Sequence, residues 1–148
     1  MLKKLVLCVF ILSVTTVAFS QNIDSLKLTG NEVPTGYMQA DELMYVTPEI
    51  RQFYEQPDIY ESFLGKVKKK EFQSFHKKGD EGSVLYFEFE TEFKGQMFLM
   101  GFLDAEKEKT KKDDSEYYAK GNILVIWNFK LHSELKKVSM AKVKELLK

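Results

Sequence analysis

Cysteine is almost absent from this chain, since its 148 residues contain only Cys8, near the N-terminus. Most of the chain therefore has no means of forming a disulfide, a cysteine nucleophile or a cysteine-ligated zinc site. Arginine is equally scarce, because Arg51 is the only one, and the 22 basic side chains are balanced by 22 acidic ones. Binding to a nucleic-acid backbone needs a basic surface and usually arginine. These shortages argue against a nucleic-acid partner.

Long apolar runs are also missing, apart from the one at residues 5–17. That run follows two lysines and is followed by Ala18-Phe19-Ser20. A basic start, a short apolar core and small residues at the end are typical of a secretory signal peptide. A membrane-spanning helix needs about 20 apolar residues, and a lipid-attachment site would have a small residue where Leu7 precedes Cys8. We therefore predict a cleaved signal peptide at residues 1–20, export to the periplasm or the extracellular space, and no stable membrane insertion.

Removal of residues 1–20 leaves 128 residues with a net charge of minus two. A chain of this length can bury one hydrophobic core without disulfides. Turn-forming residues dominate the stretch up to residue 46, including Thr29-Gly30-Asn31 and the Pro34 to Gly36 segment. We predict an irregular N-terminal leader at residues 21–46 and a single α+β domain at residues 47–148.

Residues 48–64 are predicted to be helical, with a break in the middle. Thr47 can cap the free amides of a first turn in which Pro48 fits without strain. Apolar residues then recur at helical spacing, and Pro57 should kink or interrupt the helix. Gly65 is a natural terminator. We expect either one kinked helix or two short ones.

After Gly65 the apolar period changes to two, which is typical of strands. Leu85 to Phe93 alternates clearly, and Lys94-Gly95 resembles a two-residue hairpin turn. We therefore predict a partner strand at residues 96–103, with Phe89 opposite Met100. In this register the reverse face of the hairpin carries an apolar patch that needs a cover, formed by Tyr86, Met97, Leu99 and Leu103.

A further strand is predicted at Val67 to His76, joined to the alternating strand by a hairpin centred near Gly79. Its lysines are expected at a sheet edge, because charge discourages pairing between sheets. The register predicted from this turn gives three charge-matched cross-strand pairs: Lys70 with Glu88, Lys68 with Glu90, and Lys66 with Glu92.

The rest of the chain alternates between charge and apolar character. Residues 104–116 are mostly charged and are predicted to form an exposed loop. Residues 117–131 are predicted to be a central strand, because the first half of the segment is apolar on both faces. The tail has a helical stripe that begins after Ser133 or Ser139, so either one helix or a short strand followed by a helix fits.

This element order predicts an α+β fold. We expect an antiparallel meander sheet of four, possibly five, strands, packed by an N-terminal kinked helix and a C-terminal helix. The element order resembles that of cystatin-like or NTF2-like rolls. The Gln-x-Val-x-Gly hairpin of cystatin protease inhibitors is absent, so that activity is not implied.

Few residues are suited to catalysis. His76 and His132 are the two side chains that commonly act as bases near neutral pH. Ser74 would share a strand face with His76, the minimum for a nucleophile and its base. The glutamates of the alternating strand are spaced to pair with lysines rather than to gather a cation. We assign no catalytic residues, no metal and no cofactor.

Aromatic residues are plentiful, at 14% of the chain. Methionine and aromatic side chains suit adaptable binding contacts better than catalysis. We therefore predict an exported non-enzymatic binding or protein-interaction domain. Its contact residues would be Tyr86, Met97, Leu99 and Leu103, or a cleft between helix and sheet, and its partner an unknown protein, including a second copy in a homodimer. The alternatives are a carrier of a small apolar ligand and a small secreted enzyme with His76 as acid or base.

Overall fold

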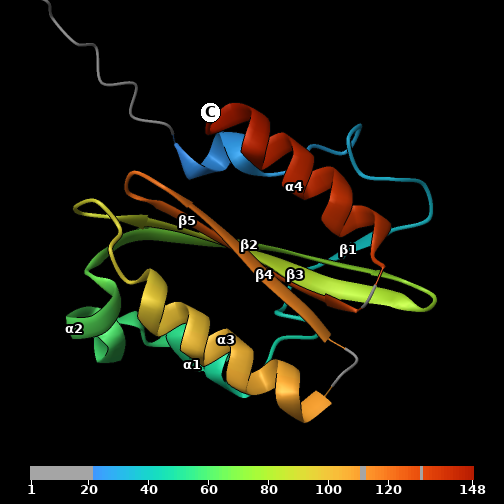
Figure 1. Cartoon of the computed structure of the whole chain (residues 1–148). Helices are drawn as coiled ribbons and strands as arrows, with labels where there is room; N and C mark the ends of the chain where they lie inside the picture. Colours follow the sequence, from blue (N-terminus) through green and yellow to red (C-terminus); the bar gives the residue numbers. More distant parts are fainter. Residues whose placement is uncertain (1–21, 111–112, 131) are drawn as a thin grey trace, which may run out of the picture.

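The computed structural model describes residues 22–110, 113–130 and 132–148, and the predicted signal peptide lies outside these ranges. The described chain is an α+β fold with an open five-stranded antiparallel sheet and four α-helices. Figure 1 shows the sheet between two helical layers.

The sheet runs in the order β1-β2-β3-β5-β4. Its strands are β1 (Met38–Ala40), β2 (Val67–Lys77), β3 (Asp80–Phe89), β4 (Asp113–Lys120) and β5 (Ile123–Lys130). The order departs from a meander at one point, because the chain passes from β3 to the outer strand β4 and returns to fill the gap with β5. The roll suggested by the element order is not confirmed, since the sheet is open.

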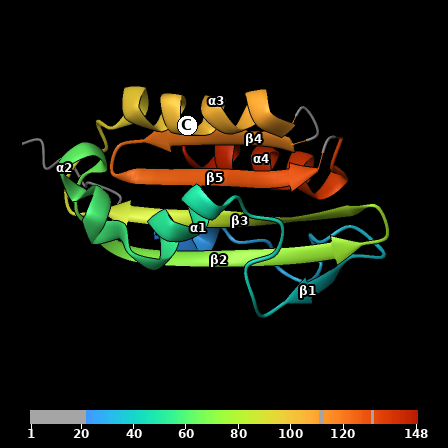
Figure 2. The same cartoon turned by 90° about the horizontal axis from the view of Figure 1, so that it is seen from below.

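The helical segments cover both faces of this sheet. They are η1 (Ile23–Leu26), α1 (Pro48–Glu55), η2 (Pro57–Tyr60), α2 (Glu61–Leu64), α3 (Gln96–Thr110) and α4 (Glu134–Leu146). Helix α4 and the short η1 lie on one face, and α1 and α3 lie on the other (Figures 1 and 2).

The helix boundaries follow the capping residues seen in the sequence. The Thr47 side chain accepts a hydrogen bond from a first-turn amide of α1, and Pro57 begins the separate η2 segment. Gly65 ends α2 with a φ of 97°, a backbone angle that residues other than glycine rarely adopt. The Ser133 side chain caps α4, so the C-terminal segment is a single helix and contains no strand before it.

The predicted strand at residues 96–103 is wrong, and so is the loop predicted at residues 104–116. Both segments contribute to the 15-residue helix α3, and the second continues into β4. Leu99 and Leu103 are four residues apart and both buried, which is the spacing of one helix face. Residues 96–109 also contain no β-branched side chain, so intrinsic propensity favours a helix. β3 also ends at Phe89, before the predicted end at Phe93, and its neighbour is β5.

The predicted register between β2 and β3 is wrong by one residue. Lys69, and not Lys70, is opposite Glu88, because the turn contains only Lys78 and Gly79. A bulge near Val67 then shifts the register once more. The ion pairs consequently form between Lys68 and Glu88, at 3.0 Å, and between Lys66 and Glu90, at 3.2 Å.

Strand β2 is not the outermost strand over its whole length. β1 pairs with residues 74–76 only. The lysine-rich first half of β2 has no strand neighbour on its outer side within the described chain. The lysines therefore lie where charge discourages pairing with another sheet.

The side chains of β3 and β5 point alternately to the two faces of the sheet, where they contribute to two separate hydrophobic cores. The core on the α4 side contains the largest side chain, Trp127, whose indole N–H donates to the Ser139 hydroxyl at 2.9 Å. The core on the α1 and α3 side is built around Phe53 and Phe87, whose rings stack at 4.5 Å. The single strand predicted at residues 117–131 is wrong, because a turn at Gly121-Asn122 divides the segment into the end of β4 and the whole of β5. β5 itself is buried on both faces, as a central strand is.

Two buried polar groups fix the N-terminal segments to the sheet. The Gln73 side chain receives the Leu28 N–H at 2.8 Å and donates to the Leu28 carbonyl at 2.9 Å. On the other face, the hydroxyls of Ser74 and Ser83 lie 2.7 Å apart, and Ser83 donates to the Met44 carbonyl at 2.6 Å. Buried polar groups need such partners, so these contacts fix the path of residues 28–44 over the sheet.

Three tyrosines with raised pKa values, Tyr37, Tyr54 and Tyr86, should reduce the stability of the fold at high pH. Burial raises the pKa of Tyr37 to about 12, helped by its hydrogen bond to the Asp80 carboxylate, and burial also raises the pKa of Tyr86. In the unfolded chain a tyrosine loses its proton near its ordinary value of 10.0. The contribution of these tyrosines to the free energy of unfolding should therefore be constant below about pH 10 and decrease as the pH rises towards 12.

Urea unfolding at about pH 9 and about pH 11 would measure this loss. In the Tyr37→Phe variant the decrease between the two pH values should be smaller than in the wild type, because one of the three phenols with a raised pKa is gone. An equal decrease in both proteins would show that Tyr37 does not contribute.

Candidate functional site

The four predicted contact residues do not share a surface. Tyr86 belongs to β3 and is fully buried in the core on the α4 side. The other three lie on α3, across the sheet. Leu99 and Leu103 face the sheet and are buried, whereas Met97 projects into solvent with 88% of its surface exposed. The apolar sheet face predicted from the sequence is therefore not formed, and of the four residues only Met97 is accessible.

A different apolar surface is exposed where η2 and α2 meet the start of α3. We call it the apolar α2–α3 surface, and it consists of five large side chains with exposed fractions between 36% and 88%: Ile59, Phe63, Met97, Phe98 and Met100. Scattered apolar side chains are normal on protein surfaces, but several on two adjoining helices mark an interaction site.

A series of aromatic contacts connects the exposed rings of this surface to the buried core. Phe63 and Phe98 stack with their centroids 4.7 Å apart. Phe98 contacts Phe102, which meets the edge of Tyr60, and Tyr60 in turn meets the edge of the buried Phe53. Offset and edge-to-face pairs of this kind are favourable beyond their burial. The exposed rings are therefore held in place from beneath.

Gly95 allows the two helices to approach. A Cβ atom at this position would lie 2.7 Å from Leu64 Cδ2 and 2.9 Å from the Phe63 carbonyl oxygen, which is too close for any side chain. Glycine thus lets the chain that enters α3 pass directly against the end of α2, and Phe98 can reach Phe63. The sequence interpretation gave Gly95 a role in a hairpin turn, whereas its role is this close contact.

The charges beside the surface are mainly acidic. Lys66 pairs with Glu90 at 3.2 Å. Its pKa is raised first by that hydrogen bond and then by the negative charges of Glu90, Glu61 and Asp58. Since one lysine is surrounded by three carboxylates, a basic partner would be favoured here.

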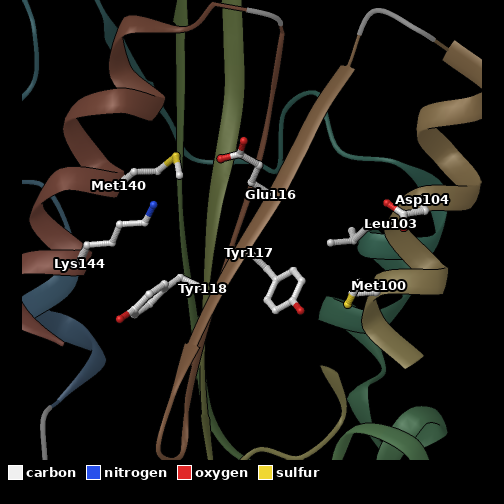
Figure 3. A pocket seen from close by; sticks show the side chains of 8 residues that line it. All are labelled: Met100, Leu103, Asp104, Glu116, Tyr117, Tyr118, Met140 and Lys144. Carbon is white, nitrogen blue, oxygen red and sulfur yellow. The ribbon is translucent and has the colours of Figure 1, made fainter. Parts of the chain in front are cut away.

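An open hollow of about 460 Å³ follows the outer strand β4, with α3 on one side and α4 on the other. Figure 3 shows that β4 divides its lining, with Tyr117 directed towards α3 and Tyr118 towards α4. Lys144 of α4 lines it, and Glu116 forms an ion pair with Lys136 at 3.5 Å. Charged groups therefore accompany its apolar walls.

The residues considered for catalysis are not brought together as a reactive group. Ser74 is buried, and its hydroxyl is engaged by Ser83 and accepts from the Met44 N–H at 3.3 Å. His76 lies nearer the end of β2, opposite Met38 of β1. In residues 22–110, 113–130 and 132–148, no three His, Cys, Asp or Glu side chains come close enough to hold a metal ion.

The described helices are all too short or too polar to cross a membrane. Compared with known proteins, the chain matches no family model, and no match to it was found among curated protein sequences or among solved structures. A functional proposal for this chain therefore depends on its own residues.

Proposed function

We propose that this chain is an exported, non-enzymatic protein-interaction domain that binds its partner through the apolar α2–α3 surface. The observation that carries the proposal is the exposure of five large apolar side chains on adjoining helices. Covering these apolar groups with a partner would favour binding by about 25 cal/mol for each Å² of apolar surface removed from water.

A protein fits this surface better than a small molecule does. Small apolar ligands bind in enclosed hollows that cover most of their surface. Here Met97, Phe63 and Ile59 project outward with more than half of their surface exposed. The two methionines can adapt to a partner, and the stacked rings of Phe63 and Phe98 supply fixed anchors. The carrier of a small apolar ligand is therefore the less favoured alternative.

The surrounding charges specify the partner further. Asp58, Glu61 and Glu90 lie close enough to Lys66 to raise its pKa, so three carboxylates surround this one lysine. A partner that offers apolar side chains flanked by lysine or arginine would be complementary to this region. The interaction should then weaken as salt is added, because exposed charges are screened.

A photo-reactive phenylalanine analogue in place of Met97 would test the proposal in the source cells. Irradiation should join the chain to a partner protein, since Met97 is the most exposed of the five side chains. The matched control carries the same analogue in place of Lys137, which is exposed on α4 in the opposite layer. The mass of the recovered chain also reports whether residues 1–20 have been removed.

In the crosslinking chain, Phe98→Ala should reduce the adduct, and the affinity for the isolated partner should decrease about tenfold or more. The same adduct from positions 97 and 137 would contradict the proposal, because it would reflect random encounters. Absence of any adduct at position 97 would contradict it too.

A further inference from the structure

The two edges of the sheet differ in how they are protected. Along β2, the last residues are covered by β1, and the lysine-rich first half carries a bulge. Both devices prevent pairing with another sheet. Strand β4, at the opposite edge, pairs with β5 without interruption over Asp113–Lys120 and has no strand on its outer side within the described chain. Figure 2 shows it as the outermost strand beside α3.

The backbone of β4 is oriented for pairing. A two-residue turn, Gly121-Asn122, joins β4 to β5, and Gly121 adopts a φ of 58°. In such a hairpin the closing pair, here Lys120 and Ile123, exchanges hydrogen bonds with each other. The backbone N–H and C=O groups of successive residues point to opposite sides of a strand. Tyr117 and Ala119 therefore direct their N–H and C=O groups to the free edge.

There is space along this edge. The hollow of about 460 Å³ lies beside Tyr117 and Tyr118, and a second, of about 440 Å³, lies beside Ala119 and Lys120. Together they follow the part of β4 whose backbone groups point outward.

We propose that β4 pairs antiparallel with β4 of a second copy of this chain, so that one sheet continues through a twofold-symmetric dimer. This goes beyond the proposed function, because its contacts are made by the edge strand β4 and not by the apolar α2–α3 surface, although Met100 borders both. The register that we propose is centred on Tyr118. It places Tyr118 opposite its own copy, Glu116 opposite Lys120, and Tyr117 opposite Ala119.

The charges select this register. The twofold axis repeats the Glu116–Lys120 pair at both ends of the contact, so each copy contributes one carboxylate and one ammonium group. These residues occupy the non-hydrogen-bonded positions, where Cα atoms approach to about 4.5 Å and side chains interact best. Tyr117 and Ala119 occupy the hydrogen-bonded positions, which agrees with the outward direction of their backbone groups. Charge and backbone thus agree on one arrangement.

Sedimentation of the full expressed chain over a range of concentrations would test the dimer. The wild type should approach twice the mass of the chain. Lys120→Glu places a second carboxylate opposite Glu116 at both ends, and the dimer dissociation constant should rise about tenfold. Lys78→Glu, an equal change of charge at an exposed turn position, should leave it unchanged. The double variant Glu116→Lys with Lys120→Glu should restore the dimer.

A backbone variant keeps the proposal falsifiable, because Glu116 also pairs with Lys136 inside each copy. Ala119→Pro removes an outward N–H without changing charge, and an edge strand tolerates proline. It should abolish the dimer while the melting temperature stays near that of the isolated monomer. A wild type that is monomeric at every accessible concentration would overturn the proposal. So would a dimer that resists Lys120→Glu and Ala119→Pro but dissociates with Phe98→Ala.

Discussion

Replacing Gly82 with alanine should lower the free energy of unfolding by about 3 kcal/mol, at the upper end of what overpacking costs. A Cβ atom at this position would lie 2.3 Å from the Phe129 ring and 2.4 Å from the Asn128 carbonyl oxygen. Phe129 is fully buried, and the carbonyl belongs to the backbone of the adjacent strand β5. Neither group can move away without separating β3 from β5.

Urea and thermal unfolding would measure the effect. A loss of this size is a large share of the 5 to 15 kcal/mol that stabilises a typical domain, and it corresponds to a decrease of roughly 10 °C in the melting temperature. The destabilisation should appear as earlier unfolding with the same cooperativity, because the whole sheet depends on the contact between β3 and β5.

The control is a second glycine-to-alanine change, at Gly101. This residue is exposed in the middle of α3, and no atom lies within 4 Å of the Cβ position. Alanine should raise stability there by about 0.5 to 1 kcal/mol, because it favours a helix over the unfolded chain. Equal stability of Gly82→Ala and the wild type would contradict the pairing of β3 with β5, and a destabilising Gly101→Ala would contradict the helix.

Local signals in the sequence were sufficient for the bounds of the helical segment at residues 48–64, for β2 and for the start of α4. Thr47, Gly65 and Ser133 act through backbone groups within a few residues of themselves, so their effect does not depend on the rest of the fold. The fold class followed from the order of the elements that these signals separate. The register of β2 and β3 was missed by one residue because turns of two and of three residues both fit the sequence around Gly79.

Helix α3 could not be identified in the same way. A helix that packs on a sheet normally shows one apolar stripe, but α3 is apolar on two sides. Leu99 and Leu103 face the core, whereas Met97 and Phe98 are exposed. Together they form a nearly continuous apolar run, in which the helical period is not visible. The side chains that form the exposed surface are thus the ones that obscured the helical period.

The candidate site depended on this missed helix. Phe63 and Phe98 are 35 positions apart in the sequence, and only the close contact at Gly95 brings their rings together. A sequence pattern carries no information about such a contact between separate segments. Met97 was selected from the sequence for its apolar character, and it is the one selected residue that lies on the exposed surface.

Phe53→Ala and Phe63→Ala should have opposite consequences, although the same side chain is removed from neighbouring helices. Phe53 is fully buried, stacks on Phe87 at 4.5 Å and meets the edge of Tyr60. Its removal leaves a cavity and should lower the free energy of unfolding by about 3 to 5 kcal/mol. Phe63 is 58% exposed, so its removal should change stability by no more than about 1 kcal/mol.

The two variants separate the fold from the surface. Denaturant unfolding should place Phe63→Ala close to the wild type and Phe53→Ala far below it, and Ile50→Val provides a milder core change for calibration, at about 1 kcal/mol. Binding should follow the reverse order among folded molecules: Phe63→Ala should weaken the crosslink from position 97, because one of the two stacked anchors is gone. If Phe63→Ala proved as destabilising as Phe53→Ala, the exposed rings would be part of the core, and their exposure would no longer indicate a partner.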